Sequence, residues 1–440
     1  MQRTGIEIDD LIASRPLSSL QLGVIVLCAL AVMFDGFDMQ TMALTVPALS
    51  ATWGVPAVTF STALAISSLG MGLGAAFIAP LGDRLGRRTV LCATLLVLAA
   101  GSAASALSHS PTELVVWRFI TGLGLGGSMP NAFALTADYL PRARRTTLLT
   151  VMYCNTATGA LIAGLSSPWL IGHFGWQGPF IAGSALPLIA CVLLLIAAPE
   201  SLKFLLLRRP LHASIPALVK RIAPDVNADE VYLQAPPTTV AGTIGDLLQP
   251  VYRRRTLWLW LGFMMNAFIL FLVVSWLPTL LVSAGWTQTR ALQASALNQV
   301  GGILGGLSLA WLMTRLGSER VLSAGFLLCM GVLLAFLVAP SGFWTWGALL
   351  LLVGACIGGA QFAIPTLLPA YYPPAILSTG GGWASAAARA GAFVSPLIGG
   401  QLLAQGMQST QVLALLTLPA AIAAVSMLVL SRMRSSVAAG

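Results

Sequence analysis

Apolar stretches long enough to cross a lipid bilayer are the feature that most restricts how this chain can fold. A bilayer core takes ~20 consecutive apolar residues in a helix, and turn or charge clusters divide the sequence into stretches of that kind. We expect twelve membrane-spanning helices, at 20–49, 57–81, 89–108, 113–138, 146–172, 176–198, 256–284, 290–313, 320–339, 343–368, 377–404 and 410–431. The sequence therefore predicts an all-α integral membrane protein that lies in the lipid bilayer.

The composition excludes several other classes of protein. Charged residues make up 8% of the 440 residues, whereas a soluble domain carries roughly 25%. The net charge of +9 does not indicate nucleic-acid binding, because the chain has only two lysines and no basic face interleaved with aromatic residues. The six cysteines lack metal-ligand spacing, and we find no nucleotide-binding loop or nucleophile–base arrangement. We therefore expect no enzyme, no metal, no cofactor and no nucleic-acid partner.

The basic residues indicate how the chain is oriented. If the N-terminus lies inside, 20 of the 23 Lys and Arg residues fall in cytoplasmic segments. Because cytoplasmic loops of membrane proteins are enriched in Lys and Arg, the pattern predicts a multi-pass protein of the cytoplasmic (inner) membrane. Both termini are expected in the cytoplasm.

The two halves of the chain repeat each other at a nearly constant offset of 232 residues. Three pairs of segments carry the repeat: 122–127 with 354–359, 139–141 with 371–373, and 159–160 with 391–392. We expect an N-terminal six-helix half (1–198), a cytoplasmic linker (199–255) and a C-terminal six-helix half (256–440). Twelve spans in two pseudo-symmetric halves are the major facilitator architecture, in which the substrate site lies between the halves near the midplane.

Two carboxylates, Asp35 and Asp38, lie inside the first apolar stretch. A charge at membrane depth costs roughly 2.5–3.5 kcal/mol on insertion scales, and such residues usually mark an ion or substrate path. Residues three apart share one helix face, and two close like charges disfavour ionisation of both, so one is expected to hold a proton. Arg118 falls at a similar depth. We expect these three residues to couple proton binding to transport; the alternative is a static ion pair that fixes helix packing.

Arg389 falls close to mid-bilayer in the stretch 377–404, and we predict no acidic residue within the helices of the second half. Its planar guanidinium suits a carboxylate in bidentate geometry, so a substrate carboxylate would satisfy it. A hydrogen bond to backbone carbonyls or to Asp35 is the alternative. Aromatic and amide side chains at midplane depth are candidates for the cavity wall, each of which could equally be a packing residue. Phe37, Tyr153, Asn298, Gln299 and Trp383 are the expected contacts, with Asn155, Asn266, Trp276 and Phe362 as further candidates.

Several motifs resemble those of a known family. Gly82-Asp-Arg-Leu-Gly-Arg-Arg88 resembles the signature between the second and third helices of the major facilitator superfamily, with Ala79 in place of its leading Gly. Other segments resemble the aromatic acid:proton symporters, which import hydroxybenzoates and related acids. These are Asp35-Gly-Phe-Asp38 with Pro47-Ala-Leu49, Arg118–Asn131, Pro199-Glu-Ser201, Ser275-Trp-Leu-Pro278, Thr379–Trp383 and Arg389-Ala-Gly391; Leu377-Ser378 replaces a basic residue often found there.

The resemblance covers both halves and implies roles for a cytoplasmic cluster. In the superfamily, the signature segment locks the second, third and eleventh helices in the outward-open state. The corresponding gating residues here are Asp83, Arg84, Arg87 and Arg88, with Asp138 as a companion at the inner end of the stretch 113–138. Part of this charge is also explained by membrane topology alone.

The residues and the resemblance together predict a transporter that moves an aromatic carboxylate, such as a hydroxybenzoate, inward with one or more protons. A proton-linked exporter of drugs or metabolites is the first alternative, although Gly164-Leu-Ser-Ser-Pro168 matches the exporter motif GPxxGG poorly. A symporter of a non-aromatic organic acid and a transport-inactive sensor are the others, and the second lacks a sizeable soluble domain. A monomer is expected by analogy with the fold.

Overall fold

Long helices make up most of the described chain, as the apolar stretches predict. The computed structural model describes residues 6–13, 15–208, 212–226, 231–232 and 243–438. The elements up to the linker are β1 (Ile6–Glu7), α1 (Ile8–Ala13), α2 (Ser19–Trp53), η1 (Ala57–Phe60), α3 (Ser61–Leu73), η2 (Gly74–Ile78), η3 (Ala79–Leu81), α4 (Gly82–Leu85), α5 (Arg87–Ala106), α6 (Pro111–Tyr139), α7 (Arg142–Phe174) and α8 (Gln177–Ala197).

The linker and the second half continue this pattern. Their elements are α9 (Leu202–Arg208), α10 (Ile215–Ile222), β2 (Val231–Tyr232), α11 (Ile244–Leu247), α12 (Pro250–Ser283), α13 (Gln288–Leu316), α14 (Ser318–Ala335), α15 (Phe343–Val353), η5 (Gly354–Gly358), α16 (Gly359–Ala363), η6 (Ile364–Leu367), α17 (Leu368–Tyr371), α18 (Pro374–Ala404), α19 (Ser409–Leu415) and α20 (Thr417–Ala438).

Local sequence explains where the long helices begin and end. Ser18 caps α2 in a capping box with Gln21, and Gly54, at φ 63°, ends the same helix. Ser110 and Thr287 cap α6 and α13 by accepting hydrogen bonds from backbone N–H groups of the first turn. Such caps satisfy N–H groups that have no partner within the helix. The turns between the apolar stretches are therefore encoded at their edges.

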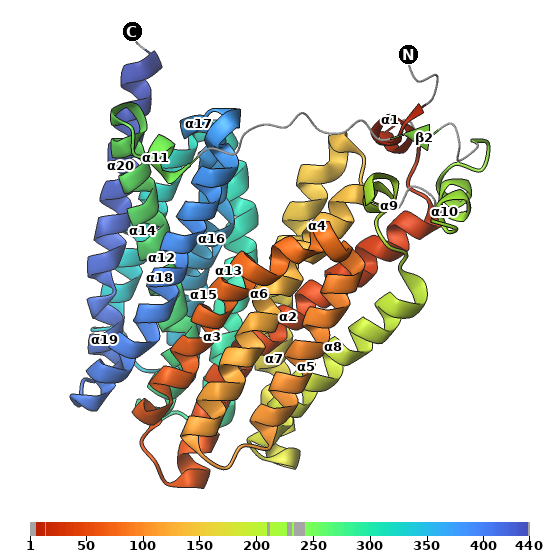
Figure 1. Cartoon of the computed structure of the whole chain (residues 1–440). Helices are drawn as coiled ribbons and strands as arrows, with labels where there is room; N and C mark the ends of the chain where they lie inside the picture. Colours follow the sequence, from red (N-terminus) through yellow and green to blue (C-terminus); the bar gives the residue numbers. More distant parts are fainter. Residues whose placement is uncertain (1–5, 14, 209–211, 227–230, 233–242, 439–440) are drawn as a thin grey trace.

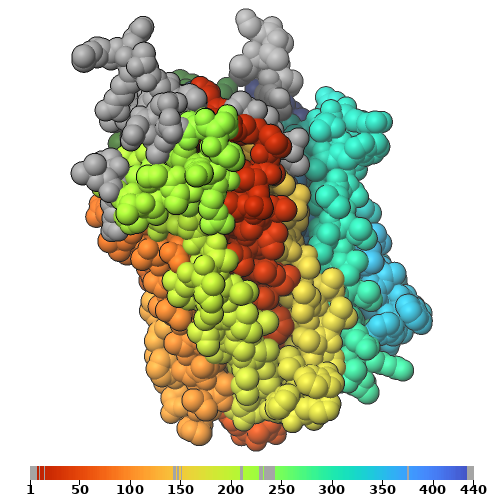
Figure 2. All heavy atoms as spheres, turned by 90° about the vertical axis from the view of Figure 1, so that its right-hand side faces the viewer, coloured from red at the N-terminus to blue at the C-terminus, as the bar shows by residue number. Residues whose placement is uncertain are grey.

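The helices form two groups that lie side by side. In Figure 1 the first-half helices (α2–α8) lie on one side and the second-half helices (α12–α20) on the other. The elements α1, α9, α10 and α11 lie at one end of both groups, which we call the linker end; the C-terminal end of α20 lies there too. Across the two groups α2 packs on α12, α3 on α18 and α7 on α13. Figure 2 shows α7 between α2 and α13 on one face.

The number of membrane spans is confirmed in part. Among the described residues, nine helical segments are long and apolar enough to cross a membrane. The long helices outside that set are α6, α7 and α18, of 29, 33 and 31 residues. At 1.5 Å per residue these helices extend about 43 Å or more, which exceeds a bilayer core. That all twelve cross the membrane stays a prediction.

Three expected helices contain breaks that the apolar pattern does not reveal. The stretch 57–81 changes to a π-helical turn at η2 and to η3 around Pro80, and 343–368 does the same at η5 and at η6 around Pro365. A third break separates α19 from α20, just before Pro419. Proline lacks the N–H that an α-helix needs, and π-helical turns often accompany functional sites.

One expectation about the second half is wrong. Glu319 lies inside α14, which begins at Ser318, so an acidic residue is present in these helices. Its side chain is buried, and Tyr371 donates a hydrogen bond of 2.7 Å to its Oε1. The helix starts earlier than hydropathy predicts, because Ser318 and Glu319 are polar residues in its first turn.

Close helix packing repeats at the offset seen in the sequence. A Cβ atom at Gly159 of α7 would overlap the backbone carbonyl of Met33 in α2. A Cβ atom at Gly391 of α18 would overlap the backbone carbonyl of Met264 in α12 in the same way. Small residues let helix backbones approach closely in membranes, where the hydrophobic effect does not drive helices together. The internal repeat is therefore visible in helix contacts as well as in residues.

The linker forms a small layer on the first half. Strand β1 pairs in parallel with β2, and Ile8 and Leu11 of α1 are buried in one cluster with Leu218 of α10. Arg15 forms an exposed ion pair with Asp225 that lowers the pKa of this carboxyl to about 2. The short α11 packs instead against α12 and α18, and Thr256 donates a hydrogen bond of 3.0 Å to its Leu247 carbonyl. The linker is thus anchored on both groups of helices.

We predict that Gly159→Ala and Gly391→Ala each lower the midpoint of thermal unfolding of the purified protein in detergent. Overpacking of this kind costs about 1–3 kcal/mol. Gly172→Ala in the same α7 is the matched control, because a Cβ there meets nothing within 4 Å and alanine favours helix. Equal midpoints for Gly159→Ala and Gly172→Ala would contradict the close packing.

Candidate functional site

A buried ion pair joins α2 and α6. Arg118 Nη2 lies 2.9 Å from Asp38 Oδ2, and Nη1 lies 3.3 Å from Oδ1. The two side chains are 1% and 0% exposed. Ser102 of α5 donates a hydrogen bond of 2.9 Å to Oδ1 of the same carboxylate. This bidentate, hydrogen-bonded geometry is what two charges need to be tolerated away from water.

Asp35 lies one helical turn earlier in α2 and has a different environment. The carboxylate is 1% exposed, and Ser128 of α6 donates a hydrogen bond to its Oδ2. Its Oδ1 has no hydrogen-bond partner in the described part of the chain. No cation among the described residues forms an ion pair with Asp35 within 4 Å, in contrast to Asp38. Protonation would remove the cost of burying this unpaired charge.

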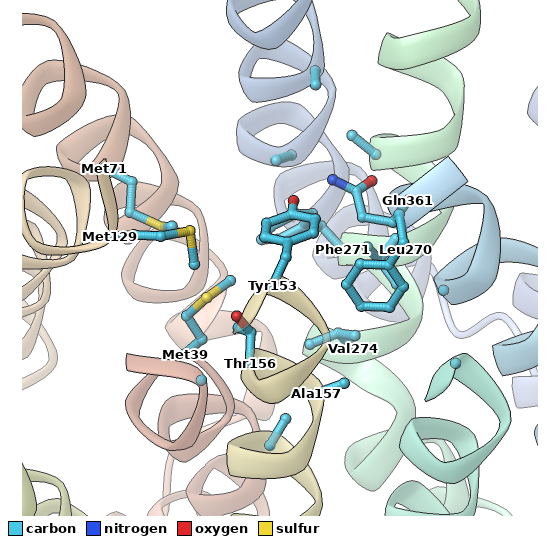
Figure 3. Close-up of a pocket in the computed structure, with 18 of the residues that line it drawn as sticks. Met39, Met71, Met129, Tyr153, Thr156, Ala157, Leu270, Phe271, Val274 and Gln361 are labelled. Atoms are coloured by element: carbon cyan, nitrogen blue, oxygen red, sulfur yellow. The ribbon is translucent and has the colours of Figure 1, made fainter. Parts of the chain in front are cut away.

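A cavity of about 200 Å³ lies between the first-half and second-half helices. Its lining comes from α2, α3, α6 and α7 on one side and from α12, α13, α16 and α18 on the other. Three methionines, Met39, Met71 and Met129, lie opposite Phe271 and Gln361, with Tyr153 between them (Figure 3). The surface therefore combines apolar and aromatic walls with a few polar groups, which is typical of small-molecule sites.

Arg389 of α18 lines this cavity. Its Nη1 contacts Met71 Sδ at 3.5 Å, a weak acceptor, and no carboxylate of the described residues lies within ion-pair distance of it. The expected pairing with Asp35 is therefore not formed. Gln299 Nε2 donates to Gln40 Oε1 at 3.4 Å. Among the described residues, these two contacts are the side-chain hydrogen bonds that join the two groups of helices.

Aromatic rings and an oriented amide make up the rest of the wall. Tyr153 meets Phe362 edge to face, with ring centroids 5.1 Å apart. Asn266 donates a hydrogen bond of 2.9 Å to Gln361 Oε1, so the amide nitrogen of Gln361 is left to the cavity, on the side of Tyr153 in Figure 3. Of the expected wall residues, Tyr153 and Gln299 line the cavity.

Three expected wall residues do not line this cavity. Phe37 is 2% exposed and packs with Ala163 and Leu292 where α2, α7 and α13 meet. Asn298 is buried and donates a hydrogen bond of 3.0 Å to the Leu350 carbonyl. Trp383 is 44% exposed and stacks on Trp260. Each lies at a suitable depth, but the rotation of its helix directs the side chain elsewhere.

The expected gating residues form a network at the linker end. Arg87 forms ion pairs with Asp83 and with Asp138, whose carboxylate also accepts a hydrogen bond from Ser201. Arg88 donates to the backbone carbonyl of Leu194 in α8 at 3.2 Å. Arg84 is exposed and forms no ion pair with a described residue.

Sequence reasoning missed several polar partners. Glu200 accepts a hydrogen bond of 2.9 Å from the backbone N–H of Arg88 at the start of α5, and Tyr139 donates to its backbone carbonyl at 2.7 Å. The motif Pro199-Glu-Ser201 pointed to this position. Ser102 and Ser128 carry no signal except that Ser128 lies ten residues after Arg118 in a quoted motif. Among the described residues, no group of His, Cys, Asp and Glu side chains could hold a metal.

Comparisons with known proteins agree with this architecture. The family model of the Major Facilitator Superfamily matches residues 28–396. The gallate transporter of Pseudomonas putida is 35% identical over 427 residues, which cover 96% of this chain and 94% of the relative. The 4-hydroxybenzoate transporter PcaK of Acinetobacter baylyi is 35% identical over 436 residues, covering 98% and 95%. The xylose transporter XylE of E. coli, in a partially occluded inward-open conformation, matches with a TM-score of 0.70 at 17% identity, covering 93% of this chain and 97% of XylE.

The fold and the matched family define a membrane transporter rather than an enzyme. The chain belongs to the Major Facilitator Superfamily and, within it, to the family of aromatic acid transporters that its motifs resemble.

We predict that Arg118→Leu lowers the thermal unfolding midpoint strongly, because it leaves Asp38 buried without a counter-charge, at a cost of about 3–5 kcal/mol. The double variant Asp38→Asn/Arg118→Leu is expected to recover most of that loss, since both charges are then gone. Thermal unfolding of the purified variants in detergent measures both effects. A double variant no more stable than Arg118→Leu would show that the pair does not act as a unit.

Proposed function

We propose that this chain carries an aromatic carboxylate into the cell together with one or more protons, by alternating access. The observation that carries this proposal is Arg389, a cation on the wall of the cavity between the helix groups with only a sulfur atom as its hydrogen-bond partner there. A guanidinium in a site of low polarity favours an anion, and a carboxylate matches its two parallel N–H donors.

The size and the walls of the cavity support an aromatic ring as the rest of the cargo. A volume of about 200 Å³ is below the ~300–1,000 Å³ typical of sites for drug-sized ligands, which disfavours an exporter of drugs. Methionine and aromatic side chains offer favourable contacts to a ring. The names of the relatives, a gallate and a 4-hydroxybenzoate transporter, support a hydroxylated benzoate as the substrate.

The buried carboxylates support proton coupling through Asp35, Asp38 and Arg118. Asp38 has a cation and two hydrogen-bond donors, whereas Asp35 has one hydroxyl donor and no cation in the described chain. A carboxylate without a counter-charge at membrane depth is costly, and protonation relieves that cost. We assign Phe37, Asn298 and Trp383 to positions behind this site rather than to contact with the ring, and retain Tyr153 and Gln299 as contacts.

Alternating access requires that the halves 1–198 and 256–440 move against each other, with 199–255 as the linker. The two hydrogen bonds that join the halves in the cavity are long, at 3.4 and 3.5 Å, so they are easily replaced by a ligand. The network of Asp83, Arg87, Arg88 and Asp138 would gate the linker end, with Arg84 in contact only in another state. We place that end and both termini in the cytoplasm, the protein in the inner membrane, and a monomer as the working unit.

The experiment that tests the function is uptake of radiolabelled 4-hydroxybenzoate, protocatechuate, 3-hydroxybenzoate and gentisate by cells that express the chain. We expect accumulation of at least one acid, abolished by a protonophore and by Asp38→Asn. Normal accumulation by Asp38→Asn at equal membrane levels would contradict proton coupling through this residue. If no acid accumulates while the protein is in the membrane, the aromatic assignment fails and a non-aromatic acid or export takes its place.

We predict that Arg389→Gln raises the KM for the transported acid by about tenfold to a hundredfold, since hydrogen bonds to charged groups contribute ~1.5–3 kcal/mol. Arg290→Gln, an exposed position at the start of α13, is the matched control and should leave the KM unchanged. Concentration dependence of initial uptake rates measures both. An unchanged KM in Arg389→Gln would remove this residue from the substrate site.

A further inference from the structure

A second, smaller chamber adjoins the cavity between the halves. It has a volume of about 40 Å³. Four residues line both spaces, Met39, Met71, Phe271 and Val274. Figure 3 shows Met39 and Met71 on one side and Phe271 and Val274 on the other, so they form a boundary across both groups of helices. Beyond it, the chamber reaches Arg118. The small chamber therefore lies between the substrate cavity and the buried ion pair.

The polar lining of this chamber comes from both halves of the protein. Ser68 of α3 and Ser275 of α12 line it and are 3% and 5% exposed. In the part of the chain that the structure describes, neither hydroxyl makes a hydrogen bond. A third serine, Ser67, donates only a long bond of 3.5 Å to its own helix. Buried hydroxyls normally have a partner, and these two serines line a space that also borders a guanidinium.

The dimensions of the chamber suit water. A buried water needs roughly 10–15 Å³ of space and two to four polar partners. The chamber exceeds that volume, and Ser68, Ser275 and Arg118 supply the partners. Apolar cavities stay dry, whereas polar ones are hydrated. The structure therefore provides a hydration site at the point where the cavity and the ion pair approach each other.

We infer that Ser68 and Ser275 hold water in this chamber, and that this water is the route by which a proton passes from the substrate cavity to the Asp38–Arg118 pair. The inference rests on the proposed function and adds a specific path to it. In the proton step, a hydronium in the chamber loses one O–H bond and an O–H bond forms on a carboxylate oxygen of Asp38. A water and a neutral carboxylic acid remain, and no electrons are exchanged.

The proton step would change the charge that the substrate cavity experiences. Once Asp38 is neutral, the guanidinium of Arg118 has lost its counter-charge and faces the hydrated chamber. Its positive charge then favours a carboxylate in the adjoining cavity. Because Ser275 belongs to the second half and Ser68 to the first, movement of the halves would also open or divide the water path. Ser275 is the first residue of the motif Ser275-Trp-Leu-Pro278, for which neither the ion pair nor Arg389 gives a role.

The test compares two activities of the full chain in proteoliposomes, with radiolabelled 4-hydroxybenzoate as the probe. Exchange of internal for external substrate requires no net proton movement, whereas accumulation driven by an imposed pH gradient does. Ser68→Val and Ser275→Val fill the chamber and remove a hydroxyl. We expect accumulation to fall about tenfold or more, a change equivalent to ~1.4 kcal/mol, while exchange falls less than about threefold. Ser275→Thr keeps the hydroxyl and should retain accumulation.

Ser295→Val is the matched control. Ser295 is as buried as the other two serines, its hydroxyl donates to the Ala291 carbonyl of its own helix at 2.9 Å, and it lines neither space. Unchanged accumulation in Ser68→Val and Ser275→Val would overturn the inference, as would an equal loss of exchange and accumulation. Retained exchange also shows that the variant is folded. If the wild-type chain itself accumulates no acid in response to the gradient, the proposed function fails first, and the serine variants are not needed to decide it.

Discussion

The buried pair of Asp38 and Arg118 is the interaction around which the first half is arranged. A charge at membrane depth is tolerated only with a counter-charge and hydrogen bonds in place, and here three helices supply them: α2 the carboxylate, α6 the guanidinium and α5 the hydroxyl of Ser102. These side chains are short enough that the helix axes must lie close together. The small residues of α6 and α7 make that approach feasible, so electrostatics and packing impose the same arrangement.

Close packing limits how the protein can change shape. Gly159 against Met33 and Gly391 against Met264 lock the equivalent helix pairs of each half, and close-packed interfaces of this kind switch between discrete arrangements rather than deform continuously. Between the halves, the described side-chain hydrogen bonds are the long contacts of Gln40 with Gln299 and of Arg389 with Met71. Strong contacts within halves and weak polar contacts between them favour rigid-body movement at the cavity.

The sequence predicted the membrane class, most helix positions and the depth of the charged residues, because hydropathy and the cost of buried charge act on single helices. It did not predict which way each helix is rotated. Phe37 and Gly36 differ by one position, yet only Gly36 lines the cavity, since each residue turns the helix by 100°. Partners that are separated by many residues, such as Ser102 for Asp38 or Gln40 for Gln299, depend on the assembled bundle. The breaks at η2 and η5 likewise depend on tertiary packing.

Charge balance links the two buried sites under the proposed function. The four groups Asp35, Asp38, Arg118 and Arg389 sum to zero when both carboxylates are ionised. A proton alone raises the sum to +1 and a substrate carboxylate alone lowers it to −1, whereas both together restore zero. Burying a net charge in a low-dielectric site is costly, so the halves should exchange sides readily when the protein is empty or fully loaded and poorly in the two intermediate states. That asymmetry is sufficient to couple one proton to one monocarboxylate, without direct contact between the proton site and the substrate.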